Sequence, residues 1–430
     1  ALSEIKNLGA THIWYTGVIE HATQTNYSRY GIRPDHPAVV KGKAGSPYAI
    51  TNYFDVDPDL SECADRRFEE FERLVERIHR HGMNVIIDFI PNHVSRQYIS
   101  ANGNQIGRNE RQDYFFERDN NFYYLQGQKL ELPQEAYNNT TNAEDYYEYP
   151  AKVTGDDCMT AKPTCNNWYE TVKLNYGIDI SDGSQHFEPI PHTWHCMLEI
   201  LRFWRSKKVD GFRCDMAEMV PTAFWKWVIN EIKAEFPDTF FIAEIYKTEL
   251  YDNFIHEAHF DYLYDKVDLY DNLKNIIKGY NNVDVITKSW QRLGNLNDYM
   301  LRFLENHDEE RIASRQFAGE PDTAIPALAV SAMMHKGPIM IYNGQEFGEK
   351  AEGVSGFSGD DGRTTIFDYW SIDTIKRWLS DTNKNNSEKQ LDDKEIALRN
   401  KHKSTSSSIG RRIISSSVPR ISDKSNSFPS

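Results

Sequence analysis

The sequence predicts an α/β fold, a (β/α)8 barrel with a domain inserted after its third strand. Two observations predict it. Short β-branched and aromatic runs alternate with helical patterns along the chain, as a parallel sheet with crossover helices requires. Most of these runs follow one another at the intervals of a βα repeat, but the interval from residue 90 to residue 209 is too long for a structureless loop.

Seven segments have the composition of buried strands. They are residues 11–18, 84–90, 209–215, 239–245, 260–264, 300–305 and 338–342. A closed barrel needs eight strands, so we expect the first strand to lie upstream of Ala1 and to be missing from this sequence. Residues 66–80 and 197–204 have apolar side chains at the spacings of amphipathic helices.

The chain divides into four parts. Residues 1–94 form the first part of the barrel with strands two and three, residues 95–182 the inserted domain, residues 183–375 the second part of the barrel with strands four to eight, and residues 376–430 the barrel end and a tail. From about Lys401 the sequence is Ser-rich and basic without the period of a helix or a strand. We expect this tail to be disordered.

Charge and hydropathy exclude two classes of partner. The chain has 49 Lys and Arg residues against 64 Asp and Glu residues, and a formal charge of −15 repels a polyphosphate, so we expect no nucleic-acid partner. No apolar run reaches the ~18 residues of a membrane span. The start at Ala1 shows no signal peptide, so secreted, periplasmic and cytoplasmic locations all stay open.

Polar side chains follow four of the predicted strands, at the point where each strand ends. The segments are DFIPNH (residues 88–93), GFRCD (211–215), AEIY (243–246) and ENHD (305–308). The carboxyl ends of the strands form the active-site face of a parallel barrel. Each segment also places a carboxylate where burial excludes one unless it is paired. We therefore expect the four segments to converge on one site.

Three of these acids, Asp215, Glu244 and Asp308, are suited to acid–base or nucleophilic work on a polyhydroxy substrate. Two carboxylates suffice for a glycosidase. Arg213 lies two residues before Asp215 and points to the same face of the strand, where it can hold Asp215 ionised. This favours Asp215 as the nucleophile and leaves Glu244 as the proton donor. A catalytic metal centre is less consistent with the segments, because they supply too few imidazoles.

The order of these segments resembles the four short conserved regions of the α-amylase family of glycoside hydrolases, and the resemblance covers roughly residues 1 to 375. Residues 46–58 (SPYAITNYFDVDP) are similar to the family's segment in which a Tyr, here Tyr48, stacks on the sugar at the cleavage site. Residues 337–348 are similar to its last barrel strand, and the predicted insertion matches its domain B. The all-β domain that usually follows the barrel in that family has no matching pattern in this sequence, and we expect it to be lacking here.

The resemblance implies a retaining mechanism on starch-type α-1,4-glucans or maltodextrins, with no cofactor for catalysis. Asp215 would form the glycosyl-enzyme intermediate, Glu244 would protonate the leaving oxygen, and Asp308 would hold two sugar hydroxyls. The residues expected to bind or support the sugar are Tyr48, Asp88, His93, Arg213 and His307.

Two departures from the family pattern affect specificity and metal binding. Glu218 and Met219 stand where many members have Lys-His, which favours maltodextrin, cyclodextrin or transfer chemistry over endo-acting starch hydrolysis. Lys173 stands where the family's structural calcium commonly takes an Asp ligand, and a cation there argues against calcium. Asn92, also a calcium ligand in many members, is then a packing or hydrogen-bonding residue.

Two alternatives to a hydrolase stay open. A glucanotransferase or maltosyltransferase would use the same catalytic residues with a sugar hydroxyl in place of water. A non-catalytic sugar-binding homologue is the other alternative, but it has no need for three converging acids.

Overall fold

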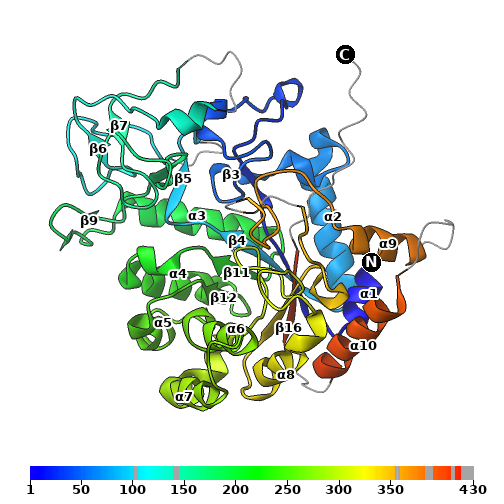
Figure 1. Ribbon diagram of the computed structural model, residues 1–430. Helices are drawn as coiled ribbons and strands as arrows, with labels where there is room; N and C mark the ends of the chain where they lie inside the picture. The colour runs from blue at the N-terminus through cyan, green and yellow to red at the C-terminus, as the bar shows by residue number, and fades with distance from the viewer. Residues whose placement is uncertain are drawn as a thin grey trace.

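The computed structural model describes residues 1–100, 105–138, 145–353, 356, 359–382, 391–407 and 412–417. Its core is a parallel sheet of eight strands in the order β14-β13-β12-β11-β4-β1-β16-β15. A parallel bridge between Arg302 and Ile339 joins the two ends of this order, so the sheet closes into a barrel (Figure 1). This confirms the predicted (β/α)8 fold.

Seven of the eight strands lie within the segments predicted from the sequence. The barrel strands are β1 (His12–Tyr15), β4 (Asn84–Phe89), β11 (Gly211–Cys214), β12 (Phe240–Ala243), β13 (Tyr262–Tyr264), β14 (Met300–Leu301), β15 (Ile339–Tyr342) and β16 (Ile413–Ser417). Side chains alternate between two buried clusters, since Trp14 and Ile86 belong to one cluster and Ile13 and Ile87 to the other. Strands buried on both faces in this way have the near-continuous apolar runs that made them predictable.

The eighth strand, β16, differs from the prediction. It lies parallel between β1 and β15, with Ile414 opposite both His12 and Met340, and it fills the place for which we expected a strand upstream of Ala1. The prediction of disorder from Lys401 onward is therefore wrong for residues 401–407, which are helical, and for residues 413–417. Residues 418–430 lie outside the described residues.

The physical reason is that β16 depends on its neighbours more than on its own composition. Ile413 and Ile414 are buried, although Arg412 precedes them and Ser residues follow them in the sequence. The backbones of β1 and β15 present hydrogen-bonding groups on both sides, and a strand of almost any composition can satisfy such groups. These hydrogen-bonding groups belong to β1 and β15, so the composition of the tail by itself does not show them.

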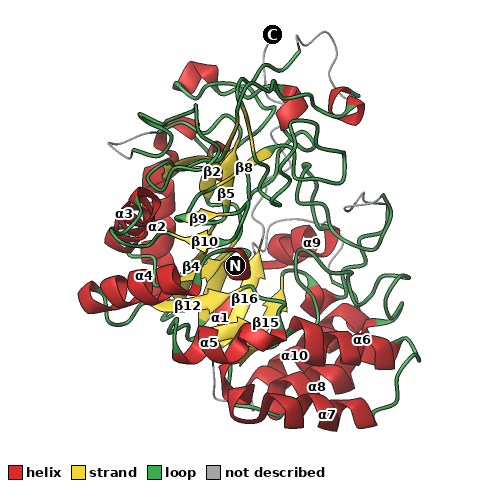
Figure 2. Cartoon of the chain, turned by 90° about the vertical axis from the view of Figure 1, so that its left-hand side faces the viewer, coloured by secondary structure: helices red, strands yellow, loops and turns green. Residues whose placement is uncertain are grey.

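Helices surround the barrel (Figures 1 and 2). They are α1 (Leu2–Asn7), α2 (Arg67–Arg80), α3 (His192–Ser206), α4 (Thr222–Glu235), α5 (Tyr251–His256), α6 (Asp271–Ile277), α7 (Asp284–Leu293), α8 (Ile325–Met333), α9 (Asp373–Thr382) and α10 (Asp393–Ser407). In α2, Phe71, Val75 and Ile78 are buried on one face, as their spacing predicts. None of the described helices combines the length and the apolar character that crossing a bilayer requires.

The long segment between β4 and α3 contains short antiparallel pairs. β5 (His93–Ser95) pairs with β8 (Thr171–Lys173), β6 (Tyr124–Leu125) with β7 (Ala151–Lys152), and β9 (Ile178–Asp179) with β10 (Ser184–Gln185). The β6–β7 part has a small core of its own around Tyr123 and Val153. A further pair, β2 (Ile19–His21) and β3 (Ile50–Val56), follows β1. β5 begins four residues after β4 ends, so the β5–β8 pair lies at the carboxyl end of the barrel strands.

Candidate active site

The four polar segments meet at the carboxyl ends of adjacent barrel strands. Arg213 on β11 is in register with Asp88 on β4 and with Ile242 on β12. Residues in register on parallel strands point to the same side of the sheet. The side chains of Asp88 and Arg213 therefore lie next to each other. Asp215 directly follows β11, and Glu244 directly follows β12.

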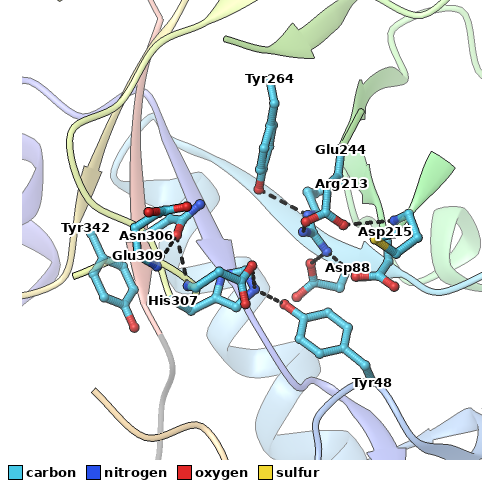
Figure 3. A network of polar contacts seen from close by, with 12 residues as sticks. Tyr48, Asp88, Arg213, Asp215, Glu244, Tyr264, Asn306, His307, Glu309 and Tyr342 are labelled. Atoms are coloured by element: carbon cyan, nitrogen blue, oxygen red, sulfur yellow. Dashed lines mark hydrogen bonds and ion pairs between the residues drawn. The ribbon is translucent and has the colours of Figure 1, made fainter. Parts of the chain in front are cut away.

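Arg213 contacts three carboxylates at once (Figure 3). Its Nη1 lies 2.6 Å from Asp215 Oδ1 and 3.4 Å from Asp88 Oδ1. Its Nη2 forms an ion pair of 2.7 Å with Glu244 Oε1, and its Nε donates to the Tyr264 hydroxyl over 3.1 Å. The guanidinium is fully buried, so these interactions are weakly screened.

Because Arg213 pairs with both Asp215 and Glu244, it does not single out Asp215 as the sequence argument expected. Burial and the nearby Glu244 carboxylate raise the pKa of Asp215 well above its usual range, and Arg213 opposes this. The two carboxyls share one cation. The contacts of Arg213 therefore do not assign the nucleophile and the acid.

Glu244 is held by further donors. The Tyr246 hydroxyl donates to Glu244 Oε1 over 2.7 Å, and the Met216 N–H donates to Oε2 over 2.8 Å. The backbone N–H groups of Tyr246 and Lys247 both donate to Glu218 Oε2, over 2.7 and 2.8 Å. Glu218 thus fixes the turn that carries Tyr246. The sequence marked Glu218 only as a departure from a pattern and did not identify this role.

Asp308 lines the same pocket as Glu244 and Asp215 and is held by a second group of side chains. His307 Nε2 lies 3.0 Å from Asp308 Oδ2 and 2.5 Å from the Tyr48 hydroxyl, and the Tyr48 and His307 rings stack. Burial disfavours the Asp308 carboxylate, but the adjacent His307, together with Arg213 and Arg363, outweighs burial and lowers the pKa of Asp308. Asn306 Oδ1 accepts the Asp308 N–H over 2.8 Å and so fixes the turn.

His93, the first residue of β5, also lines this pocket. Its ring packs edge-on against Trp168 at 5.3 Å between centroids. Burial, together with the charge of Lys173, lowers the pKa of His93 to about 3. The imidazole is therefore neutral near pH 7 and can both donate and accept a hydrogen bond.

A pocket of about 220 Å³ joins these side chains. Five of the predicted site residues line it, namely Tyr48, His93, Asp215, Glu244 and Asp308. The other three, Asp88, Arg213 and His307, are buried and do not line it. Arg213 and His307 contact lining residues, and the sugar-binding roles predicted for these three residues stay predictions.

The pocket lining also includes residues that were not predicted individually from the sequence. These are Lys41, Ser46, Trp168, Glu170, Thr171, Met216, Tyr246, Ile366 and Phe367. Lys41 Nζ pairs with Glu170 Oε1 at 2.8 Å, which joins the segment between β2 and β3 to the insertion. Trp168 and Phe367 lie outside helices and strands, where no periodic signal exists. Aromatic composition was the only available signal for them.

A model of the alpha-amylase catalytic domain matches residues 1–181 and 190–407 of this chain. The chain belongs to the alpha-amylase family. The resemblance that the four polar segments indicated is thereby confirmed.

Individual alpha-amylase relatives are distant. Alpha-amylase MalA of Haloarcula japonica is 24% identical over 354 residues, which are 81% of this chain and 40% of that protein. Alpha-1,4-glucan:maltose-1-phosphate maltosyltransferase of Cereibacter sphaeroides is 24% identical over 254 residues, 57% of this chain and 32% of that protein. The chain thus spans less than half the length of these two curated relatives.

Solved structures of the family share the fold. The crystal structure of an alpha-amylase from Lactobacillus plantarum aligns with a TM-score of 0.54 at 23% identity, over 89% of this chain and 75% of that one. At this level of identity the likeness shows the barrel architecture alone.

Proposed function

We propose that this alpha-amylase family domain is a retaining glycoside hydrolase that cleaves α-1,4-glucosidic bonds in starch-type glucans or maltodextrins. The observation that carries the proposal is that Asp215 and Glu244 line one pocket and bind the two terminal nitrogens of one guanidinium. Retaining glycosidases keep their two catalytic carboxyls about 5 to 5.5 Å apart, closer than inverting enzymes do. A shared guanidinium holds two carboxylates close together, which supports retention.

In this mechanism Asp215 attacks the anomeric carbon and forms a glycosyl-enzyme ester while Glu244 gives its proton to the leaving oxygen. Glu244 then removes a proton from water, which attacks the same carbon and releases Asp215. The assignment rests on the place of Asp215 in GFRCD and of Glu244 in AEIY, the family's second and third segments. Tyr246 and Met216 fix both oxygens of Glu244 for this transfer.

The other pocket residues suit a sugar ring. Asp308 is one-third exposed and has a lowered pKa, so it is an ionised acceptor for two sugar hydroxyls. Tyr48, Trp168 and Phe367 offer flat apolar faces for the sugar's C–H groups. Asp88, Arg213 and His307 are buried behind the pocket lining. Arg213 pairs with Asp88, Asp215 and Glu244, and His307 pairs with Asp308.

A glucanotransferase or maltosyltransferase is the second candidate, with a sugar hydroxyl in place of water. Two observations favour this transferase activity as a second candidate. Glu218 binds the backbone of Tyr246 and Lys247 where many family members carry a Lys side chain for the leaving-group sugar. The relative from Cereibacter sphaeroides is also named as a maltosyltransferase.

The test is activity on starch, pullulan and maltodextrins, with the anomer of the first product identified by NMR. We expect the α-anomer, and an inverted product would overturn the proposal. Asp215→Asn and Glu244→Gln should each lower turnover by roughly a thousandfold or more, while Asp252→Asn, an exposed control, should not. The products formed from maltoheptaose distinguish hydrolysis from transfer, since only transfer yields chains longer than the substrate.

A further inference from the structure

A buried ammonium group lies where the insertion meets the barrel. Lys173 on β8 is 5% exposed, and its Nζ lies 2.5 Å from Asn92 Oδ1, 3.3 Å from the Met219 carbonyl oxygen and 2.8 Å from Asp157 Oδ1. The three oxygens come from the segment after β4, the segment after β11 and the insertion. A lysine has three N–H donors, and all three find an oxygen acceptor here.

By the family resemblance, Asn92 and position 173 correspond to ligands of the family's structural calcium. That ion would need Asn92 and an Asp at position 173 among about six to eight oxygen ligands. Lys173 supplies no oxygen, and its ammonium already lies at hydrogen-bond distance from Asn92. Within the described part of the chain, no group of three or more His, Cys, Asp or Glu side chains is arranged to hold a metal ion. The residues present therefore do not fit calcium.

The contacts of Lys173 extend to the pocket. Asn92, whose Oδ1 faces the ammonium, donates through Nδ2 to the Gly155 carbonyl oxygen over 2.8 Å, and this nitrogen lies 3.1 Å from His93 Nδ1. Lys173 is also directly opposite His93 in the β5–β8 ladder. The ammonium thus joins Asp157 of the insertion to the segments after β4 and β11. Through Asn92 it is also connected to His93 in the pocket lining.

We propose that Lys173 is a built-in cation that replaces a structural calcium ion and fastens the inserted domain to the barrel. Its oxygen partners, Asn92, Asp157 and Met219, are the kinds of ligand that calcium uses. The proposal makes the folded domain independent of calcium. It also means that exchanging Lys173 for a carboxylate converts the same contacts into a calcium site.

The experiment measures thermal unfolding with a chelator and with added Ca²⁺. The unchanged chain should have the same midpoint in both conditions. Lys173→Asp should unfold at a lower temperature with the chelator, and Ca²⁺ should raise its midpoint by at least about 2 °C. Lys173→Met, which has neither charge nor oxygen, should be destabilised equally in both conditions.

The matched control is Lys162→Asp, because Lys162 lies in the same insertion with its side chain 69% exposed. It should show no response to Ca²⁺. The proposal is overturned if the chelator lowers the midpoint of the unchanged chain, or if elemental analysis finds one calcium per chain in it. A Lys173→Asp chain that folds but ignores Ca²⁺ also overturns it. If that variant does not fold in either condition, the chelator measurement on the unchanged chain still decides.

Discussion

The hydroxyl of Tyr246 donates a hydrogen bond to Glu244 Oε1, 2.7 Å away. Both residues line the pocket, so this bond acts on the group proposed to transfer the proton. The turn that presents Tyr246 is itself fixed by Glu218. Tyr246, which follows β12, and Glu218, which follows β11, thus help to determine where this carboxyl group lies.

Tyr246→Phe should lower kcat/KM on maltodextrin by roughly ten- to a hundredfold, because a hydrogen bond to a charged group contributes about 1.5 to 3 kcal/mol. The thermal midpoint should change little, since the ring stays in place. Steady-state kinetics and circular dichroism check the two expectations. The control is Tyr280→Phe, which removes the hydroxyl of a tyrosine that is 74% exposed. Equal kinetics in the two variants would show that the bond to Glu244 has no catalytic effect.

Arg213→Lys should impair both activity and stability although it keeps the charge. A single ammonium cannot reach Asp215 and Glu244 in the way that the two terminal nitrogens of the guanidinium do. The carboxylates left without a partner are buried, and breaking such a pair costs about 3 to 5 kcal/mol. Urea unfolding measures this loss. Arg315→Lys, at an exposed pair with Asp360, should stay within about 1 kcal/mol of the unchanged chain.

The pH dependence of stability should have a contribution from Glu20, a buried residue of β2 outside the pocket. Burial, with the nearby Asp55 and Asp57 carboxylates, raises the pKa of Glu20 to about 7, against the opposing effects of Asn52 and Arg67. The folded chain therefore binds this proton more tightly than the unfolded chain does. The contribution of this bound proton to the free energy of unfolding is complete below pH ~4.5 and is lost as the pH rises through about 7.

Glu20→Gln keeps the shape and an acceptor for Asn52 but cannot ionise. Its unfolding free energy should be similar to that of the unchanged chain near pH ~4.5, and higher by up to about 3 kcal/mol at pH ~8. Urea unfolding at the two pH values measures the difference. If both chains lose stability in parallel across this range, Glu20 does not titrate as described.

The sequence predicted the parts of the fold and site that local patterns encode. Seven strands could be found because strands buried on both faces are continuous apolar runs, and Asp215 and Glu244 could be found because they end such runs. Trp168 and Phe367 could not be found, since they reach the pocket from segments without a period. The pairing of Arg213 with Glu244 depends on the register of two strands, which one strand's sequence does not contain.

The tail shows the same limit, and β16 can be tested directly. Ile414 is 1% exposed and packs in the cluster that contains Trp14 and Met340. Ile414→Asp would bury a charge without a partner in this cluster, so the unfolding free energy should fall by about 3 kcal/mol or more. Lys403→Asp, at an exposed position of α10, should change it by no more than about 0.5 kcal/mol. Equal stabilities of the two variants would mean that Ile414 is not part of the barrel, and the eighth strand would then have to come from elsewhere.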